Sequence, residues 1–286
     1  MNLMNETKFI MNKYNITANK SLGQNFLIDE DVVNGIVDKS EVDKGDLVIE
    51  IGPGLGTLTA VLLEKAGKVV CIELDKRMVQ IVTERFSIYE NFEVINEDVL
   101  KVDLEKVIDE NLKKNNLKTA KIVANLPYYI TTPIIMKLLE DRLKLESITV
   151  MVQKEVAERL AEKPGGKESG AITYSINYFS NPSIVIDVPN MSFIPAPEVN
   201  SAVIKLDLLK EPKIIVKNEK TLFKVIKLAF MQKRKTLVNA LHNGKLLDNK
   251  QEIEIMLAKL GIDNKVRGEN LTLEQFGLIA DYIESI

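Results

Sequence analysis

The chain is poor in the residues that disulfides, most metal sites and histidine-dependent catalytic centres require. Its 286 residues include one histidine, His242, and one cysteine, Cys71. A single cysteine excludes a disulfide within the chain, and the two residues cannot form a Cys/His metal cluster. Catalysis based on histidine is disfavoured for the same reason. We therefore expect no metal and a reducing, cytoplasmic setting.

Long apolar segments are also absent. No apolar run reaches the length that a membrane-spanning helix needs, and the polar N-terminus has no apolar signal core. We expect neither a membrane span nor secretion. Nothing in the sequence indicates an obligate dimer, so we expect a monomer.

A net excess of positive charge is absent from the chain as a whole but present in one region. The net charge of the chain is −3. Residues 205–250 nevertheless hold twelve Lys/Arg against four Asp/Glu, a net charge of +8, so the remainder carries −11. This asymmetry indicates a polyanionic partner better than the total does. The alternative is a solvated helical surface that happens to be rich in lysine.

What is present is enough apolar sequence, 45% of residues, for a full core. Strand-like runs alternate with segments of helical periodicity, which predicts an α/β fold with a mostly parallel, doubly wound sheet. Two further runs lack a long helix between them and predict an antiparallel edge pair. The expected strands are residues 47–51, 69–73, 92–96, 122–125 and 147–153, with the edge pair at 184–188 and 202–209; the expected helices are 57–65, 76–86, 104–112, 133–139 and 155–161, after a first helix capped by Asp29.

Three regions follow from this pattern. Residues 1–20 are expected to be a loosely structured arm, and residues 21–209 to form the sheet domain. After residue 209 the strand signal fades and apolar residues recur at helical spacing. Residues 210–286 are therefore expected to form a small, all-helical C-terminal domain, whose last helix opens with a capping box of Thr272 and Gln275.

The tetrad Asn125-Leu126-Pro127-Tyr128 follows a buried strand and precedes a helix. In an open α/β sheet, ligands bind at that edge. An amide oxygen and a backbone carbonyl can accept the two hydrogens of a nucleobase amine, and an aromatic ring can stack on the base. The tetrad therefore predicts a site for an exocyclic amine. The alternative is a proline-containing turn with a structural asparagine.

A glycine loop, Gly52-Pro53-Gly54-Leu55-Gly56, joins the first expected strand to the next helix. Its spacing is tighter than the dinucleotide fingerprint, and no Gly-Lys-Ser/Thr of a phosphate-binding loop follows. The spacing is similar to the S-adenosylmethionine site of class I methyltransferases, although a nicotinamide-dependent dehydrogenase stays open. Glu73, at the end of the second strand, can accept ribose hydroxyls. Asp98, after the third strand, can accept an adenine amine or cap the following segment.

Several segments together resemble the ribosomal RNA adenine dimethyltransferase family, and most of all its bacterial small-subunit branch. The resemblance covers nearly the whole chain from about residue 13, and it leaves residues 1–12 and 113–118 unmatched. Its motifs are residues 21–27 (SLGQNFL), the glycine loop, the tetrad, 151–159, 193–201 (FIPAPEVNS) and 232–237.

The resemblance implies a Rossmann-like class I methyltransferase fold and S-adenosyl-L-methionine as cofactor. It also implies N6,N6-dimethylation of two adjacent adenosines near the 3′ end of 16S rRNA in the small ribosomal subunit. Carried over by residue, the cofactor-binding positions are Asn25, Leu27, Gly52, Glu73, Asp98 and Asn125. The catalytic positions are Asn125, Leu126, Tyr128 and Phe193, with the two rings stacking on either face of an adenine that has left its stack.

RNA docking is expected to be mostly electrostatic and selective for shape. The expected phosphate contacts are Lys224, Lys227, Lys233, Arg234 and Lys235. Two other functions stay open beside the dehydrogenase. One is methylation of large-subunit rRNA, as in macrolide resistance, and the other is a non-catalytic RNA-binding role in ribosome assembly.

Overall fold

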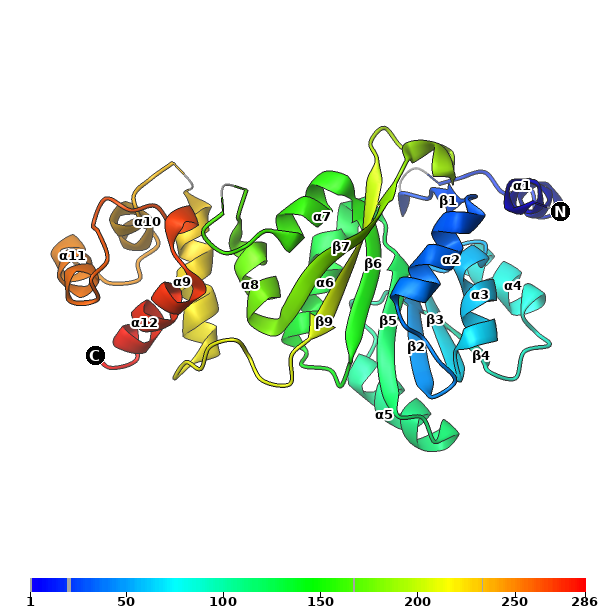
Figure 1. The fold of residues 1–286 in the computed structure, drawn as a ribbon, viewed down its shortest axis with the longest axis horizontal. Helices are drawn as coiled ribbons and strands as arrows, with labels where there is room; N and C mark the ends of the chain where they lie inside the picture. The colour runs from blue at the N-terminus through cyan, green and yellow to red at the C-terminus, as the bar shows by residue number, and fades with distance from the viewer. Residues whose placement is uncertain (1, 20–21, 167, 233) are drawn as a thin grey trace. The chain divides into compact units, whose positions relative to one another are not determined.

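The chain folds into two compact units in a computed structural model that describes residues 2–19, 22–166, 168–232 and 234–286 (Figure 1). The sheet unit comprises Met1–Glu158 and Pro182–Leu208, and the helical unit comprises Arg159–Asn181 and Leu209–Ile286. The sequence placed residues 21–209 in the sheet domain. In the structure, residues 159–181 belong to the helical unit instead, because they cluster with the C-terminal helices. No helix of the described residues is both long and apolar enough to cross a membrane.

A seven-stranded sheet is the centre of the sheet unit. Its strand order is β4-β3-β2-β5-β6-β9-β7. The pairs from β4 to β6 are parallel, whereas β9 runs antiparallel to β6, with Met151 opposite Val203. The prediction of a mostly parallel sheet with an antiparallel edge is therefore confirmed. The strands are β2 (Asp46–Ile51), β3 (Lys68–Glu73), β4 (Phe92–Asn96), β5 (Thr119–Asn125), β6 (Ser147–Gln153), β7 (Ser180–Val188) and β9 (Ser201–Leu208).

Helices follow the parallel strands and cover both faces of the sheet (Figure 1). Acidic side chains cap three of them, because a carboxylate satisfies N–H groups that the first turn leaves unpaired. Asp29 accepts from Val32 N, Asp75 from Arg77 N and Asp103 from Lys106 N. The helices are α2 (Glu30–Lys39), α3 (Thr57–Lys65), α4 (Lys76–Arg85), α5 (Leu104–Asn115), α6 (Thr131–Glu140) and α7 (Lys154–Ala161).

The N-terminal segment is a helix where a loosely structured arm was expected. Helix α1 (Leu3–Lys13) is capped by Asn2, whose side chain accepts a hydrogen bond from Asn5 N. Its buried Ile10 joins a small apolar cluster with Met78 and Ile81. The prediction was wrong here because the helix is amphipathic only weakly, and its stabilising partners lie far away in the sequence.

Helix α8 (Ala171–Phe179) of the helical unit lies in a segment for which the sequence pattern predicted no helix. It consists largely of β-branched and aromatic residues, which favour strands in isolation. Burial overrides that preference, because Tyr174 packs edge-on against Phe276 at 5.0 Å and donates a 2.6 Å hydrogen bond to the Leu271 carbonyl. The other helices of this unit are α9 (Glu219–Met231), α10 (Leu237–Asn243), α11 (Lys250–Lys259) and α12 (Leu273–Ile283), and the capping box of Thr272 and Gln275 is confirmed.

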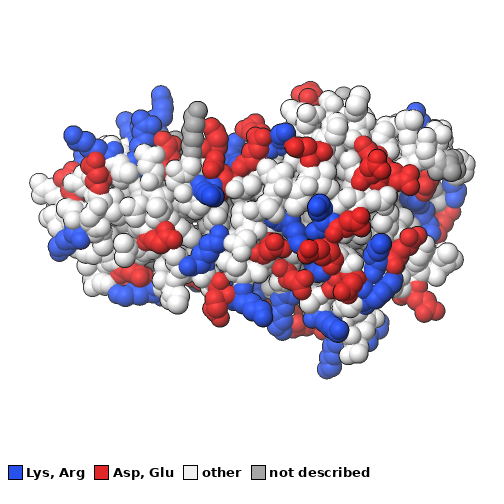
Figure 2. Space-filling view, in the orientation of Figure 1, with Lys and Arg blue, Asp and Glu red and all other residues white. Residues whose placement is uncertain are grey.

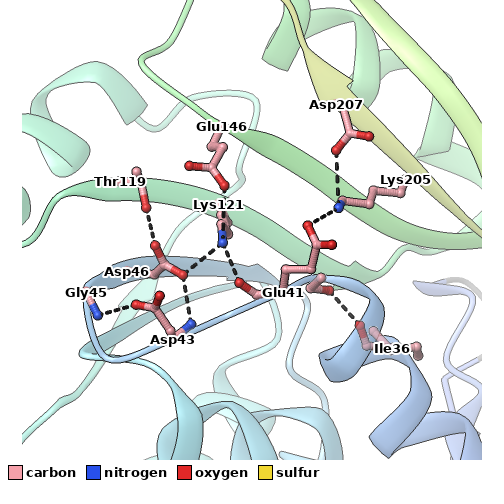
Figure 3. A network of polar contacts seen from close by, with 11 residues as sticks. Ile36, Glu41, Asp43, Gly45, Asp46, Thr119, Lys121, Glu146, Lys205 and Asp207 are labelled. Atoms are coloured by element: carbon pink, nitrogen blue, oxygen red, sulfur yellow. Dashed lines mark hydrogen bonds and ion pairs between the residues drawn. The ribbon is translucent and has the colours of Figure 1, made fainter.

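A polar network ties the amino ends of the central strands together (Figure 3). Lys121 of β5 pairs with Asp46 of β2 at 2.9 Å, and each side chain is only 5% exposed. The ammonium also donates to the Glu41 carbonyl at 2.6 Å and lies 3.3 Å from the Glu146 carboxylate. This network is at the edge of the sheet opposite to the carboxyl ends of the parallel strands.

The same network continues to the antiparallel strand β9. Lys205 pairs with Glu41 at 2.6 Å and with Asp207 at 3.2 Å. The hydrogen bond and charge of Lys205 lower the pKa of the Glu41 carboxyl. The loop after α2 is therefore fastened to β5 and β9 at once.

Candidate active site

A cavity opens at the carboxyl ends of β2, β3, β4 and β5, within the sheet unit. Its volume is about 1100 Å³ when its opening to solvent is included. The sheet order reverses between β2 and β5, so the cavity lies at the topological switch point of the sheet, where open α/β folds bind ligands. Among the residues predicted from the sequence, the cavity is lined by Asn25, Leu27, Gly52, Glu73, Asp98, Asn125, Leu126 and Tyr128.

The glycine loop forms one wall because its backbone adopts left-handed conformations. Gly52, Gly54 and Gly56 have φ of +70°, +56° and +84°, a region that favours glycine. A Cβ on Gly52 would meet no atom within 4 Å, so a ligand can come close to this backbone. A Cβ on Gly56 would lie 2.5 Å from the Phe86 ring, so Gly56 allows α3 and α4 to pack.

Two carboxylates face the cavity from successive strand ends. Glu73 accepts hydrogen bonds from Gly54 N at 3.3 Å and Asp75 N at 2.8 Å, and its burial raises the pKa of its carboxyl. Asp98 accepts from Leu100 N at 3.0 Å, which stabilises the turn after β4. Asp98 thus closes a turn and lines the cavity, whereas the cap of the following helix is Asp103 and not Asp98.

A third carboxyl group, Glu50, lies at the base of the cavity and is 2% exposed. Burial raises its pKa to about 7. It accepts hydrogen bonds from the Thr59 hydroxyl at 2.6 Å and from the Cys71 thiol at 3.4 Å. The same burial raises the pKa of the Cys71 thiol, so the only cysteine of the chain is a buried, protonated hydrogen-bond donor.

The tetrad bends away from the sheet immediately after β5. Asn125 ends that strand, Tyr128 begins a short 3-10 turn (Tyr128–Ile130), and α6 follows at once. The Asn125 Nδ2 group donates to the Asn25 carbonyl at 3.3 Å. Leu126 is 1% exposed and its N–H donates to the Met151 carbonyl at 3.1 Å, which fixes the backbone at the turn. The Tyr128 hydroxyl shares a 2.6 Å hydrogen bond with Ser201, and burial raises the pKa of this phenol.

Phe193 is the predicted site residue that the structure places elsewhere. It is 2% exposed, does not line the cavity, and belongs to the main apolar core of the sheet unit. Its strand, β8 (Phe193–Ile194), pairs with β1 (Phe26–Leu27), and Phe193 is opposite Leu27. An aromatic residue near a binding motif has the same sequence signature whether its ring faces a ligand or the core.

Sequence reasoning missed several residues that line the cavity. Tyr129 is the most informative, because it directly follows the tetrad and its side chain is 57% exposed. A Cβ on Gly23 would lie 3.3 Å from its ring, so the ring lies against the N-terminal segment. The feature that marks Tyr129 as a site residue is the exposure of its aromatic ring, and the sequence alone does not show which aromatic residues are exposed. The other lining residues include Gln24, Pro53, Leu74 and Glu97.

The predicted RNA contacts lie in the helical unit. Lys224 and Lys227 are exposed on α9, on the side away from its buried Leu222, Val225 and Ile226. Arg234 and Lys235 are exposed in the loop before α10, whereas Lys233 lies outside the described residues. Figure 2 shows lysine and arginine side chains at several separate places on the visible face of this unit, with acidic side chains among them. In the part of the chain that the structure describes, no group of three or more His, Cys, Asp or Glu is placed to hold a metal ion.

These features define a Rossmann-like class I methyltransferase that depends on S-adenosylmethionine. The family model described as ribosomal RNA adenine dimethylase matches residues 15–285, and the chain belongs to this family.

Relatives and solved structures agree with that assignment. The "Ribosomal RNA small subunit methyltransferase A" of Alkaliphilus oremlandii is 48% identical over 276 residues, covering 96% of this chain and 95% of the relative. The protein of the same name from Bacillus licheniformis is 46% identical and covers 98% and 96%. The crystal structure of a dimethyladenosine transferase from Plasmodium falciparum has a TM-score of 0.74 at 27% identity, covering 89% of this chain and 95% of that one. The 23S rRNA methyltransferase ErmE has a TM-score of 0.68 at 24% identity, over 91% and 100%, and shares the fold.

Proposed function

We propose that this protein dimethylates N6 of two adjacent adenosines near the 3′ end of 16S rRNA, in the small ribosomal subunit, with S-adenosylmethionine as the methyl donor. The observation that carries the proposal is the position of Asn125 and Leu126. They lie at the edge of a cavity that also contains a glycine loop and two carboxylates. The full-length relatives named for the small subunit, at 46–48% identity, supply the choice of substrate.

The residues present fit the cofactor. A carboxylate at the end of β3, Glu73, suits two ribose hydroxyls, which donate hydrogen bonds. Asp98 suits the adenine amine of the cofactor, and the open approach to Gly52 leaves room for its methionine end. Asn25 and Leu27 would close the cavity from the N-terminal segment. When bound, S-adenosylmethionine supplies an electrophilic methyl group on a positive sulfonium.

The chain's own contribution is to position a weakly nucleophilic amine. Because Asn125 Nδ2 faces the Asn25 carbonyl, Oδ1 is the amide atom that can accept one hydrogen of the target amine. The Leu126 carbonyl would accept the other. Both acceptors orient the nitrogen lone pair toward the methyl group, so positioning supplies most of the rate enhancement. No strong general base is required, because the amine nitrogen would become positively charged on gaining a methyl group and would then release a proton to solvent.

Stacking would hold the flipped adenine, at roughly 1–3 kcal/mol for each ring. Tyr128 lines the cavity and is fastened by Ser201, which suits a fixed platform. Phe193 would have to leave the core to form the second wall. Tyr129, already exposed at the cavity, is the better candidate for that role in this conformation.

The basic side chains of the helical unit are proposed to bind phosphates of the RNA, and the protein is proposed to act as a cytoplasmic monomer.

The competing functions, a nicotinamide-dependent dehydrogenase and a non-catalytic assembly factor, are less well supported. A dinucleotide-binding dehydrogenase has a sixth parallel strand beside the fifth. In this sheet the fifth parallel strand is β6, and its neighbour β9 runs antiparallel to it. An intact tetrad and both carboxylates disfavour a purely structural role in assembly.

Two measurements test the proposal. Calorimetry should detect binding of S-adenosylmethionine and none of NAD. Labelled cofactor should transfer methyl groups to under-methylated small subunits and not to large subunits. Label in the large subunit would favour the macrolide-resistance type of activity, and the absence of transfer to either subunit would contradict the proposal.

A further inference from the structure

Arg85, the last residue of α4, connects the glycine loop to the N-terminal helix. Its side chain is 16% exposed, and its Nη2 atom pairs with Glu6 Oε1 of α1 at 2.7 Å. Its Nη1 atom donates to the carbonyl of Leu55, the residue between the last two glycines of the loop. The guanidinium also lies over the Phe86 ring, 5.1 Å from its centroid. The Arg85 guanidinium therefore connects α4, α1 and the glycine loop.

Apolar packing reinforces the same connection. Ile10 of α1 and Ile16 beyond it form a cluster with Phe26, Leu55, Met78 and Ile81. Phe26 and Leu55 also line the cofactor cavity. The N-terminal helix thus packs in the same apolar cluster as two residues that line the cavity, although no residue of the helix lines the cavity itself.

The glycine loop has a physical reason to need such a support. Its three glycines have positive φ, and glycine gains the most conformational freedom when a loop is not held. A charged donor on a backbone carbonyl is a strong restraint, because hydrogen bonds to ionised groups are about twice as strong as neutral ones. Arg85 supplies that restraint at Leu55, and Glu6 fixes the guanidinium that provides it.

We propose that Arg85 is a positioning residue for the cofactor, and that Glu6 of α1 acts through it. In this way the N-terminal helix sets the affinity for S-adenosylmethionine without touching it. The matched family region begins at residue 15, so α1 lies outside it. The inference rests on the proposed function for its ligand alone, and it requires nothing of the RNA substrate.

The test compares full-length variants by calorimetry with S-adenosylmethionine. Arg85→Met removes the charge and keeps the stem, and we expect Kd to rise about tenfold, as for the loss of one charged hydrogen bond. Glu6→Gln should raise Kd about threefold, and Arg85→Lys should be intermediate because an ammonium lacks the fork that reaches both partners. With methyl transfer, KM for the cofactor should rise while kcat stays within about twofold.

Two controls separate positioning from stability. Lys13→Gln breaks the exposed 2.8 Å pair between Lys13 and Glu84, which joins the same two helices away from the loop; its Kd should stay within about twofold. Ile108→Val, at a buried position of α5, lowers thermal stability and should leave Kd unchanged. A normal Kd in Arg85→Met, or an equal rise in Ile108→Val, would overturn the inference. Failure of wild-type protein to methylate small subunits would contradict the proposed function, and the binding comparison would still decide the role of Arg85.

Discussion

At the scale of single residues, the proposed active site depends on the hydrogen-bond partners of each polar side chain. Asn125 and Glu73 were predicted from strand-end positions, since parallel strands bring their carboxyl ends to one edge. Phe193 could not be placed, because its ring takes part in core packing that only the pairing of β1 and β8 defines. Arg85 has no motif at all, and its role comes from partners 30 and 79 residues away.

Replacing Asn125 by alanine should abolish methyl transfer, because the amine loses one of its two acceptors. We expect kcat to fall at least about 100-fold, the usual effect of losing one fixed polar group at a reacting centre. Cofactor Kd should change by no more than a few-fold. The matched control is Asn115→Ala on the exposed side of α5, which should keep full activity. Substantial turnover in Asn125→Ala would exclude the proposed role.

Glu50 should make stability depend on pH. Its pKa is about 7 in the folded protein against an ordinary value of 4.5, so folding favours its protonated form. This contribution is complete below pH 4.5 and is lost as pH rises through 7. Wild type should lose roughly 2–3 kcal/mol relative to Glu50→Gln between pH 5 and pH 8. Denaturant unfolding of both proteins measures the difference, and a constant difference over that range would show that Glu50 does not titrate near 7.

At the scale of elements, alternating strands and helices were predictable because each buries a periodic apolar face. Helix α8 was missed, since its β-branched and aromatic residues are helical only in the context of Tyr174 and Phe276 packing. Helix α1 was missed for a related reason, because its docking depends on Arg85 and Ile81 of α4. The network around Lys121 is likewise a property of assembled strands.

Replacing Lys121 by methionine should destabilise the sheet unit by roughly 3 kcal/mol, because it leaves the Asp46 carboxylate buried without its cation. Removing the acid as well, in Asp46→Asn with Lys121→Met, should restore part of the loss. The control is Lys144→Met, whose pair with Asp109 is exposed and should change stability by less than about 0.5 kcal/mol. Equal effects of Lys121→Met and Lys144→Met on denaturant unfolding would argue against this network as a stabilising one.

At the scale of the whole molecule, a chain of net charge −3 carries a net charge of +8 in residues 205–250. The sheet unit holds the cavity proposed to bind the cofactor, and the helical unit presents exposed lysine and arginine side chains. The family and the class of fold could be predicted from ordered motifs. The assignment of residues 159–181 to the helical unit could not, because it depends on the packing of α8.

Binding to small-subunit RNA should weaken steeply with salt if the helical unit docks on phosphates. Each phosphate contact contributes about 0.7–0.9 to the slope of log affinity against log salt. The double variant Lys224→Gln with Lys227→Gln should therefore reduce the slope by roughly 1–2. The matched control, Lys113→Gln with Lys114→Gln on exposed α5 of the sheet unit, should keep the wild-type slope. A flat salt dependence for the wild type would contradict docking by charge.

The chemical identity of the product decides whether this protein is a small-subunit rRNA adenine dimethyltransferase. Purified protein, S-adenosylmethionine and under-methylated small subunits are incubated, and the rRNA is digested and analysed by mass spectrometry. We expect N6,N6-dimethyladenosine at two adjacent positions near the 3′ end of 16S rRNA, and none with Asn125→Ala. Methylation at another base, or at 23S rRNA instead, would contradict this function.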